Sequence, residues 1–319
     1  MKRRVLIAGT VVLAAAILGG VLVARGRPDA DVAPLRFAYQ NRIGSALCIV
    51  AVEQRLVDEV GLALEAARFT SGPATSEALY AGAADIAAMG DTTAVIAVTR
   101  ESRFSIVASH GAGEHRHRIV VAEDSPIRKP TDLIGARLAV RKGTSTYGGL
   151  LVFSERNGID LSRIDVIDMG PSEMPDALAA GSIDAFVASE PTPSLAEARG
   201  AREIATLGGL GNNYPILLVA RNDFLERRPE DTAKFVRAMR RAERFVRERP
   251  DDTIDLLVRV TGLSDDSVRA AMERHTYRLT LDEEIRDGLG ATAEFLRSQN
   301  LIDRVPDWNA ALASIVDAE

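Results

Sequence analysis

The sequence predicts an α/β protein with two lobes of similar design, each a mostly parallel sheet flanked by helices, and a mostly helical C-terminal region. Apolar runs of strand length alternate with periodic segments of helix length, which is the pattern of parallel sheets covered by helices. The segment ALYAGAAD at residues 78–85 recurs as ALAAGSID at residues 177–184. With 319 residues, 46% of them hydrophobic, the chain is long enough for each lobe to bury its own core.

The first 27 residues are predicted to meet a membrane. Lys2, Arg3 and Arg4 precede an apolar run at residues 5–24, which fits a secretory signal peptide. At about 1.5 Å rise per residue the same run is also long enough for an uncleaved membrane anchor, so both alternatives stay open. Either one places the globular part in the periplasm or another extracytoplasmic space, after a polar linker at residues 28–34.

Seven apolar runs are predicted to be strands. The first, LRFAY, opens the globular part, and the others follow at intervals that leave room for helices between them. In chain order the predicted strands are residues 35–39, 62–68, 86–89, 104–108, 119–122, 137–140 and 164–167.

The repeated segment predicts the same local structure twice. In each copy a helix ends at a glycine, Gly82 or Gly181, which can take the left-handed conformation, and an aspartate then opens a short buried strand. A polar loop follows each strand, at residues 90–93 and 189–192. Open α/β sheets bind ligands at such carboxyl ends, so these loops are candidate binding loops. The alternative is that a common helix-to-strand connection recurs by chance.

Two strand-to-helix connections are candidate anion sites. Residues 142–146 (KGTST) precede a helix predicted at residues 147–157, and residues 71–76 occupy the corresponding position in the first half. A helix start offers free backbone N–H groups to a small anion, but Ser or Thr there is first of all an N-cap. Two facing helix starts would form a cleft. Neither has the glycine spacing of a phosphate loop.

The C-terminal region, from residue 229 onward, is predicted to be nearly all helix. An apolar stripe at residues 235–246 ends before Pro250. Ser264 is predicted to cap one helix, and Thr280 with Glu283 to form the capping box of another.

Composition disfavours several classes of function. The net charge is −6 although the N-terminal segment is basic, and binding to nucleic acid needs a basic surface. His115 and His117 could hold a metal, but no third ligand is evident, and a structural role is the stronger interpretation. Cys48 is the only cysteine, which excludes an internal disulfide. The local sequence contains no nucleophile elbow, so we expect no catalytic residues, no metal and no cofactor.

Three motifs in order resemble one family. They are EALYAGAADIAAMGDTTAV at residues 77–95, DLIGARLAVRKGTS at residues 132–145 and ALAAGSIDAFVASEP at residues 177–191. Over residues 35–300 the chain resembles the solute-binding proteins of ABC importers for aliphatic sulfonates, taurine, nitrate and thiamine-precursor pyrimidines. The resemblance implies a type II periplasmic-binding fold, with lobe 1 at residues 35–121 and 214–319 and lobe 2 at residues 122–213.

The resemblance also implies a solute bound between the lobes, which close on it and present it to ABC permease subunits, the protein itself being a monomer. Asp91 and Glu190 fit awkwardly beside a simple anion, which favours a zwitterion or a neutral heterocycle. Ser189 stands where the family often has an aromatic residue, which puts stacking of a flat ring in doubt. The positions implied to line the cleft are Tyr39, Gln40, Asn41, Ser71, Gly72, Asp91, Thr92, Gly143, Thr144, Ser145 and Glu190, with His110 and Tyr214 as weaker candidates.

Two alternatives from other classes remain. One is a membrane-tethered sensor that uses the same closure without transport. The other is an enzyme on the same fold, such as the pyrimidine synthase of thiamine biosynthesis, although this chain lacks the cysteine cluster associated with that enzyme.

Overall fold

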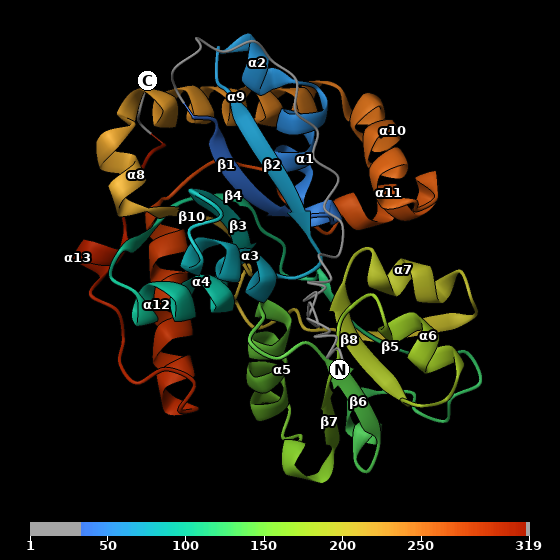
Figure 1. Cartoon of the computed structure of the whole chain (residues 1–319). Coiled ribbons are helices and arrows are strands. Elements are labelled where there is room, and N and C mark those ends of the chain that lie inside the picture. Colours follow the sequence, from blue (N-terminus) through green and yellow to red (C-terminus); the bar gives the residue numbers. More distant parts are fainter. Residues whose placement is uncertain (1–32, 317–319) are drawn as a thin grey trace, which may run out of the picture.

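The computed structural model describes residues 33–316 and confirms the predicted α/β class: two five-stranded sheets, each flanked by helices (Figure 1). The first sheet and its helices form the large lobe. Its strands lie in the order β2-β1-β3-β10-β4. Their bounds are β1 (Leu35–Gln40), β2 (Leu64–Phe69), β3 (Ile86–Gly90), β4 (Phe104–Gly111) and β10 (Ile216–Arg221).

The second sheet and its helices form the small lobe, with strands in the order β7-β6-β8-β5-β9. They are β5 (His117–Ala122), β6 (Arg137–Val140), β7 (Asp165–Asp168), β8 (Ala185–Ser189) and β9 (Ala201–Thr206). Because β5 pairs within this sheet, the chain enters the small lobe before residue 117, earlier than the expected boundary at residue 121.

Each sheet has one strand that runs against the other four. In the large lobe it is β10, which pairs antiparallel with β3 and β4; in the small lobe it is β5, antiparallel to β8 and β9. Both are the first strands after the chain crosses between lobes. The two sheets are therefore mostly parallel, as expected, and the odd strand of each adjoins a crossover.

Helices cover both lobes, and the C-terminal region is mostly helical, as expected (Figure 1). On the small lobe they are α5 (Ser145–Arg156), α6 (Met174–Ala179) and α7 (Thr192–Glu197). The large lobe carries α1 (Ala46–Glu53), α2 (Leu56–Glu59), α3 (Gly72–Tyr80), α4 (Asp91–Arg100), α8 (Asn222–Arg227), α9 (Pro229–Glu248), α10 (Pro250–Thr261), α11 (Asp265–Met272), α12 (Glu283–Ser298) and α13 (Trp308–Ala311). Short 3₁₀ turns lie at Ile43–Ser45, Pro130–Leu133 and Leu161–Arg163.

The repeated sequence segment builds the same ion pair in both lobes. In the large lobe Arg36 donates from its backbone N and its Nε to Asp85 Oδ2, at 3.0 and 3.1 Å. In the small lobe Arg137 donates from the same two atoms to Asp184 Oδ2, at 2.8 and 3.1 Å. Gly82 and Gly181 both have φ of +68°, which favours glycine. The recurrence therefore reflects a shared arrangement rather than chance.

Two predicted helix starts need correction. The last long helix, α12, is capped by Asp282, whose side chain accepts from Ile285 N; the expected capping box of Thr280 and Glu283 is wrong because Asp282 lies closer to the helix start. Helix α5 begins at Ser145, two residues before the prediction. Ser264 caps α11 as predicted.

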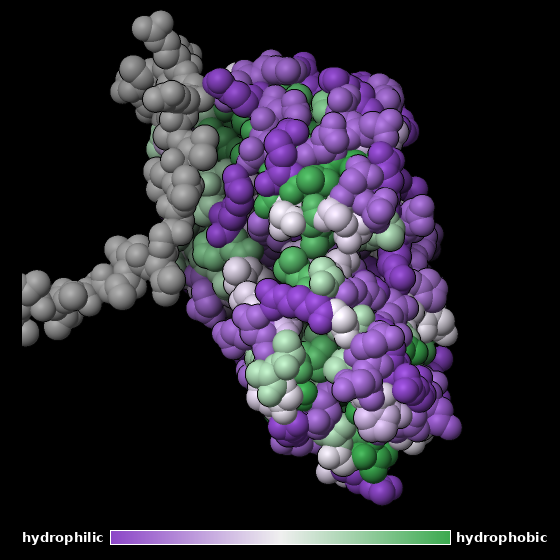
Figure 2. Space-filling model, turned by 90° about the vertical axis from the view of Figure 1, so that its right-hand side faces the viewer, coloured by the Kyte–Doolittle hydropathy of each residue, from purple (hydrophilic) through white to green (hydrophobic). Residues whose placement is uncertain are grey.

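One face of the molecule is mostly hydrophilic. Figure 2 shows hydrophilic residues over most of one face, with apolar residues in small patches between them. Within residues 33–316 no helix combines the length and apolar character needed to cross a bilayer. The predicted signal peptide or anchor at residues 1–27, and most of the linker at residues 28–34, lie outside the described residues.

Candidate functional site

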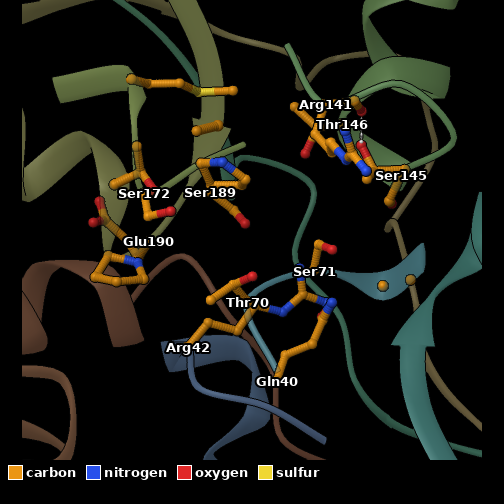
Figure 3. Close-up of a pocket in the computed structure, with 18 of the residues that line it drawn as sticks. Gln40, Arg42, Thr70, Ser71, Arg141, Ser145, Thr146, Ser172, Ser189 and Glu190 are labelled. Carbon is orange, nitrogen blue, oxygen red and sulfur yellow. Dashed lines mark hydrogen bonds between the residues drawn. The ribbon is translucent and has the colours of Figure 1, made fainter. Parts of the chain in front are cut away.

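A cavity of about 230 Å³ lies between the two lobes, and we call it the interlobe pocket (Figure 3). In the close-up, Gln40, Arg42, Thr70 and Ser71 of the large lobe face the labelled residues of the small lobe across it. The large lobe lines the pocket with Gln40, Asn41, Arg42, Thr70, Ser71, Gly72, Gly90 and Thr93. The small lobe lines it with Arg141, Thr144, Ser145, Thr146, Pro171, Ser172, Met174, Val187, Ala188, Ser189, Glu190, Pro191, Thr192 and Leu195.

The large-lobe wall is made where two neighbouring strands end. Strands β1 and β2 are parallel and paired, so Gln40 and Phe69 lie opposite each other and the residues that follow them meet at one edge. Helix α3 starts here, with Ser71 as its N-cap residue. At Gly72 a Cβ would lie 2.9 Å from Thr93 Oγ1, so glycine permits this close approach.

Arg42 is the most informative residue of this wall. Its Nε and Nη2 are buried and have no hydrogen-bond partner among the described residues. Burial lowers the pKa of Arg42 to about 9, since no carboxylate pairs with the guanidinium. Gln40, only 3% exposed, also has an unpaired amide oxygen. Unpaired buried polar groups are costly, and here they border a cavity that an anion could fill.

On the small lobe, the start of α5 faces Arg42. Thr144 is the N-cap: its hydroxyl accepts from Tyr147 N at 3.3 Å and donates to the Arg141 carbonyl at 2.6 Å. The N-cap interpretation of this threonine is therefore correct, although it also lines the pocket. Arg141 contributes a second cation, held by a long, half-exposed pair with Asp168 at 3.3 Å, which is worth little.

Glu190 closes the other end of the small-lobe wall, after β8. Its Oε1 accepts from Arg118 Nη1 at 2.6 Å, and its Oε2 accepts from Ser194 N at 3.2 Å. The side chains of Arg118 and Glu190 are 7% and 2% exposed. Arg118 also pairs with Glu197 and Glu203; burial alone would lower the pKa of Arg118, but its three carboxylate partners raise it. Glu190 is therefore a compensated buried carboxylate.

Asp91 connects the lobes rather than lining the pocket. Its Oδ1 accepts from the Ser145 hydroxyl of the small lobe and from Thr92 N at 2.7 Å. Arg116, in the first crossover, donates from Nη2 to Ser145 Oγ at 3.0 Å and from Nε to the Tyr214 carbonyl of the second crossover at 3.1 Å. We call Asp91, Ser145 and Arg116 the interlobe bridge.

A second contact lies beside the bridge, where Thr93 Oγ1 donates to the Gly143 carbonyl at 2.8 Å. A Cβ on Gly148 would lie 2.5 Å from Thr92 Oγ1, so α5 packs closely on the large lobe at this point. The lobes thus meet through specific contacts around the pocket.

The predicted site residues divide into three groups. Seven line the pocket: Gln40, Asn41, Ser71, Gly72, Thr144, Ser145 and Glu190. Asp91, Thr92 and Gly143 lie beside it, in the contacts between the lobes.

Tyr39, His110 and Tyr214 do not line the pocket. Tyr39 points into the core and stacks on Phe37 at 5.5 Å between ring centroids, because alternate residues of a strand face opposite sides. His110 is fully buried, with both ring nitrogens 3.8 Å from Cys48 Sγ. Tyr214 is buried and donates to the Leu207 carbonyl at 2.8 Å.

Sequence reasoning missed several lining residues, among them both arginines. Arg42 follows Gln40 and Asn41, and Arg141 follows the last residue of β6. A basic residue directly after an apolar strand, at the edge where ligands bind, is the signal that could have found them. Six more lining residues lie in loops that the sequence predicted as candidate binding loops or anion sites, without being singled out there: Gly90, Thr93, Thr146, Ser189, Pro191 and Thr192. The other lining residues that were missed are Thr70, Pro171, Ser172, Met174, Val187, Ala188 and Leu195.

Three histidines lie near the bridge, the buried His110 and His117 and the half-buried His275, but they are not grouped as metal ligands. Burial lowers the pKa of His110 and of His275 to about 3 and holds that of His117 well below its ordinary value. His117 is buried whereas His115 is largely exposed, so the two do not share one site. In the part of the chain that the structure describes, no three His, Cys, Asp or Glu side chains are grouped to hold a metal ion.

Comparison with known proteins identifies relatives over most of the chain. The family model described as NMT1/THI5 like matches residues 44–253. The taurine-binding periplasmic protein of Escherichia coli (strain K12) is 24% identical over 283 residues, covering 84% of this chain and 87% of that protein.

Solved structures share the fold. The alkanesulfonate-binding protein SsuA from Xanthomonas axonopodis pv. citri, bound to MOPS, has a TM-score of 0.81 at 23% identity, covering 90% of this chain and 100% of that chain. The desulfurization enzyme DSZB has a TM-score of 0.67 at 18% identity, covering 89% and 98%. The expected periplasmic-binding fold is confirmed.

Proposed function

The chain belongs to the NMT1/THI5-like family, and on that premise we propose that it is the extracytoplasmic solute-binding component of an ABC importer. It captures a small organic solute with a sulfonate-like anionic group in the interlobe pocket. The taurine-binding relative supports the class of solute, and the positive character of the pocket supports the anion.

The main support for this proposal is Arg42. A buried guanidinium with two free donor atoms matches an oxyanion, which accepts charge-assisted hydrogen bonds. The hydroxyl of Ser71 and the backbone N–H groups at the starts of α3 and α5 add donors from both lobes. The seven lining residues named above, together with Arg42 and Arg141, form the proposed binding site.

The two carboxylates that disfavoured an anion at the level of sequence are compensated. Arg118 pairs with Glu190, and Asp91 accepts from Ser145 beside the buried Arg116. An anion in the pocket therefore meets Arg42 as its unpaired charge partner, and the electrostatic objection to a sulfonate no longer applies.

Capture and closure follow from the position of the pocket. A solute held by Arg42 on the large lobe gains contacts with Thr144 and its neighbours only when the lobes approach, so binding favours the closed state by the difference in affinity between the two states. We place the hinge at the two crossovers that precede β5 and β10, and the two sheets are the moving bodies.

The remaining partners follow from this role. The N-terminal segment exports the protein or tethers it to the membrane, so that it acts in the periplasm as a monomer and delivers its solute to permease subunits. The relatives are named as periplasmic binding proteins. An enzymatic role is disfavoured because these relatives are named as binding proteins rather than enzymes.

The test is a ligand screen of the purified full-length chain by thermal unfolding and calorimetry, against ethanesulfonate, butanesulfonate, taurine, nitrate and a pyrimidine. A ligand that binds only the folded state raises stability by about 2.7 kcal/mol at a hundred times its Kd. We expect a saturable shift with sulfonates that Arg42→Gln abolishes. A response confined to the pyrimidine would contradict the proposed class of solute.

A further inference from the structure

We propose that the pocket selects sulfonates with an uncharged tail and discriminates against zwitterions. The one carboxylate lining the pocket, Glu190, is already bound to Arg118 and is therefore not available to an ammonium group. This inference rests on the function proposed above. It concerns the end of the solute remote from the anion.

An ammonium group in a buried site needs an anionic or strongly accepting partner. Among the residues that line the pocket, Glu190 is the only acidic one, and the unpaired amide oxygens of Gln40 and Asn41 lie on the opposite wall, with Arg42. Figure 3 shows its carboxylate pointing away from Gln40, Arg42 and Ser71 on the opposite wall. Its two oxygens accept from Arg118 and from Ser194 N. The carboxylate is therefore turned toward the interior of the small lobe.

The partners of Arg118 keep Glu190 in that position. Glu197 and Glu203 also pair with this guanidinium, but their side chains are 33% and 26% exposed, so water screens these two pairs. Glu203 is also shared with Arg274, at 3.1 Å. Glu190 is the partner that is almost fully buried. An ammonium would have to draw this carboxylate away from Arg118 and leave a buried cation short of a partner, which is costly.

The rest of this end of the pocket is lined by apolar side chains and by the hydroxyl-bearing residues Ser172, Ser189 and Thr192. Met174, Val187 and Ala188 are buried there, and Pro171 and Pro191 flank them. Leu195 on α7 stands at the rim.

Leu195, at 37%, is the one exposed large hydrophobic side chain of the described residues. Exposed apolar side chains that border a pocket mark a surface that a ligand can cover. A short alkyl tail that reaches Leu195 would bury apolar surface of the tail and of the Leu195 side chain. Each buried methylene tightens binding about fourfold. The cavity of about 230 Å³ restricts such a tail to a short chain.

Calorimetry of the full-length chain with three probes tests the inference. Taurine and ethanesulfonate are matched except for the ammonium group, and butanesulfonate extends the tail by two methylenes. We expect taurine to bind at least tenfold more weakly than ethanesulfonate, and butanesulfonate to bind about 15-fold more tightly than ethanesulfonate. Taurine binding as tightly as ethanesulfonate would overturn the inference while leaving the proposed function intact; binding of none of the three would overturn both.

Two variants separate the residues involved. Leu195→Ser changes an exposed side chain, so the fold is preserved, and it should reduce the advantage of butanesulfonate over ethanesulfonate severalfold; an unchanged ratio would contradict the tail position. Glu190→Gln should leave the ratio of taurine to ethanesulfonate affinity unchanged. A selective loss of taurine binding in that variant would show that Glu190 holds the ammonium group and that the proposal is wrong.

Discussion

Replacing Arg42 with glutamine should weaken solute binding without destabilising the fold. In the free protein the guanidinium is an unpaired cation with two buried donor atoms, so its removal relieves a cost instead of breaking a contact. In the complex those two donors would each form a charge-assisted hydrogen bond worth about 1.5–3 kcal/mol. We take the lower end, about 3 kcal/mol in total, because the solute must also be desolvated, and this corresponds to roughly 150-fold in Kd.

Two assays on each variant separate this outcome from a structural role. Calorimetry with butanesulfonate gives Kd, and urea unfolding gives the free energy of unfolding. Arg118→Met is the matched control, since it removes an arginine that is paired. It should lower the free energy of unfolding by about 3–5 kcal/mol, because Glu190 is left buried without its partner.

The reasoning would be refuted if Arg42→Gln lowered the free energy of unfolding by more than about 2 kcal/mol and changed Kd less than threefold. That result would mean that Arg42 supports the fold through interactions within the large lobe. We expect Arg42→Gln to lose affinity for the solute while its free energy of unfolding equals or exceeds that of the original chain.

Three further predictions concern the lobes. Gly148→Ala should weaken solute binding at least tenfold in calorimetry, because the added Cβ would lie 2.5 Å from Thr92 Oγ1 and oppose closure of the lobes. Gly290→Ala is the control, since a Cβ there would have no atom within 4 Å. Asp91→Asn should weaken binding about tenfold and enlarge the radius of gyration of the solute-bound protein in X-ray scattering, since the bridge to Ser145 loses a charged acceptor. Burial lowers the pKa of His110 and of His275 to about 3 and lowers that of His117 as well, so the unfolded chain binds more protons than the folded chain between pH 6.5 and about 3. Stability should therefore fall as pH drops through this window, by about 1 kcal/mol per histidine and pH unit, and histidine-to-glutamine variants should show a shallower dependence in urea titrations.

The fold could be predicted because its signals are local. Strands β1, β3 and β6 are apolar runs bounded by polar residues, and the glycine and aspartate of the repeated segment act within a few residues of the strands they precede. Two strands were not predicted. The residues of β9 are all half-buried, so no apolar run marks it, whereas β10 is an apolar run that was left unassigned.

The site could be predicted only in part. The strand-end loops were found, since the carboxyl edge of a parallel sheet follows from topology. The significance of Arg42 depends on what does not contact it, and the role of Glu190 depends on Arg118, which is 72 residues away in the sequence. No sequence pattern marks the Arg118–Glu190 pair, so the sequence alone leaves Glu190 as an uncompensated carboxylate that disfavours an anion.

The place of β10 in the large sheet has a consequence for the order of folding. This strand lies between β3 and β4, although it follows all five strands of the small lobe in the chain. The large sheet is therefore incomplete until residue 221 is available, whereas the strands of the small lobe form one continuous stretch, from residue 117 to residue 206. Contacts between distant segments form slowly, so the small lobe should fold first as a unit and the large lobe should close around β10 afterwards. A chain that emerges from N- to C-terminus would expose the edges of β3 and β4 during this interval, and this is the stage at which the protein should be most prone to aggregate.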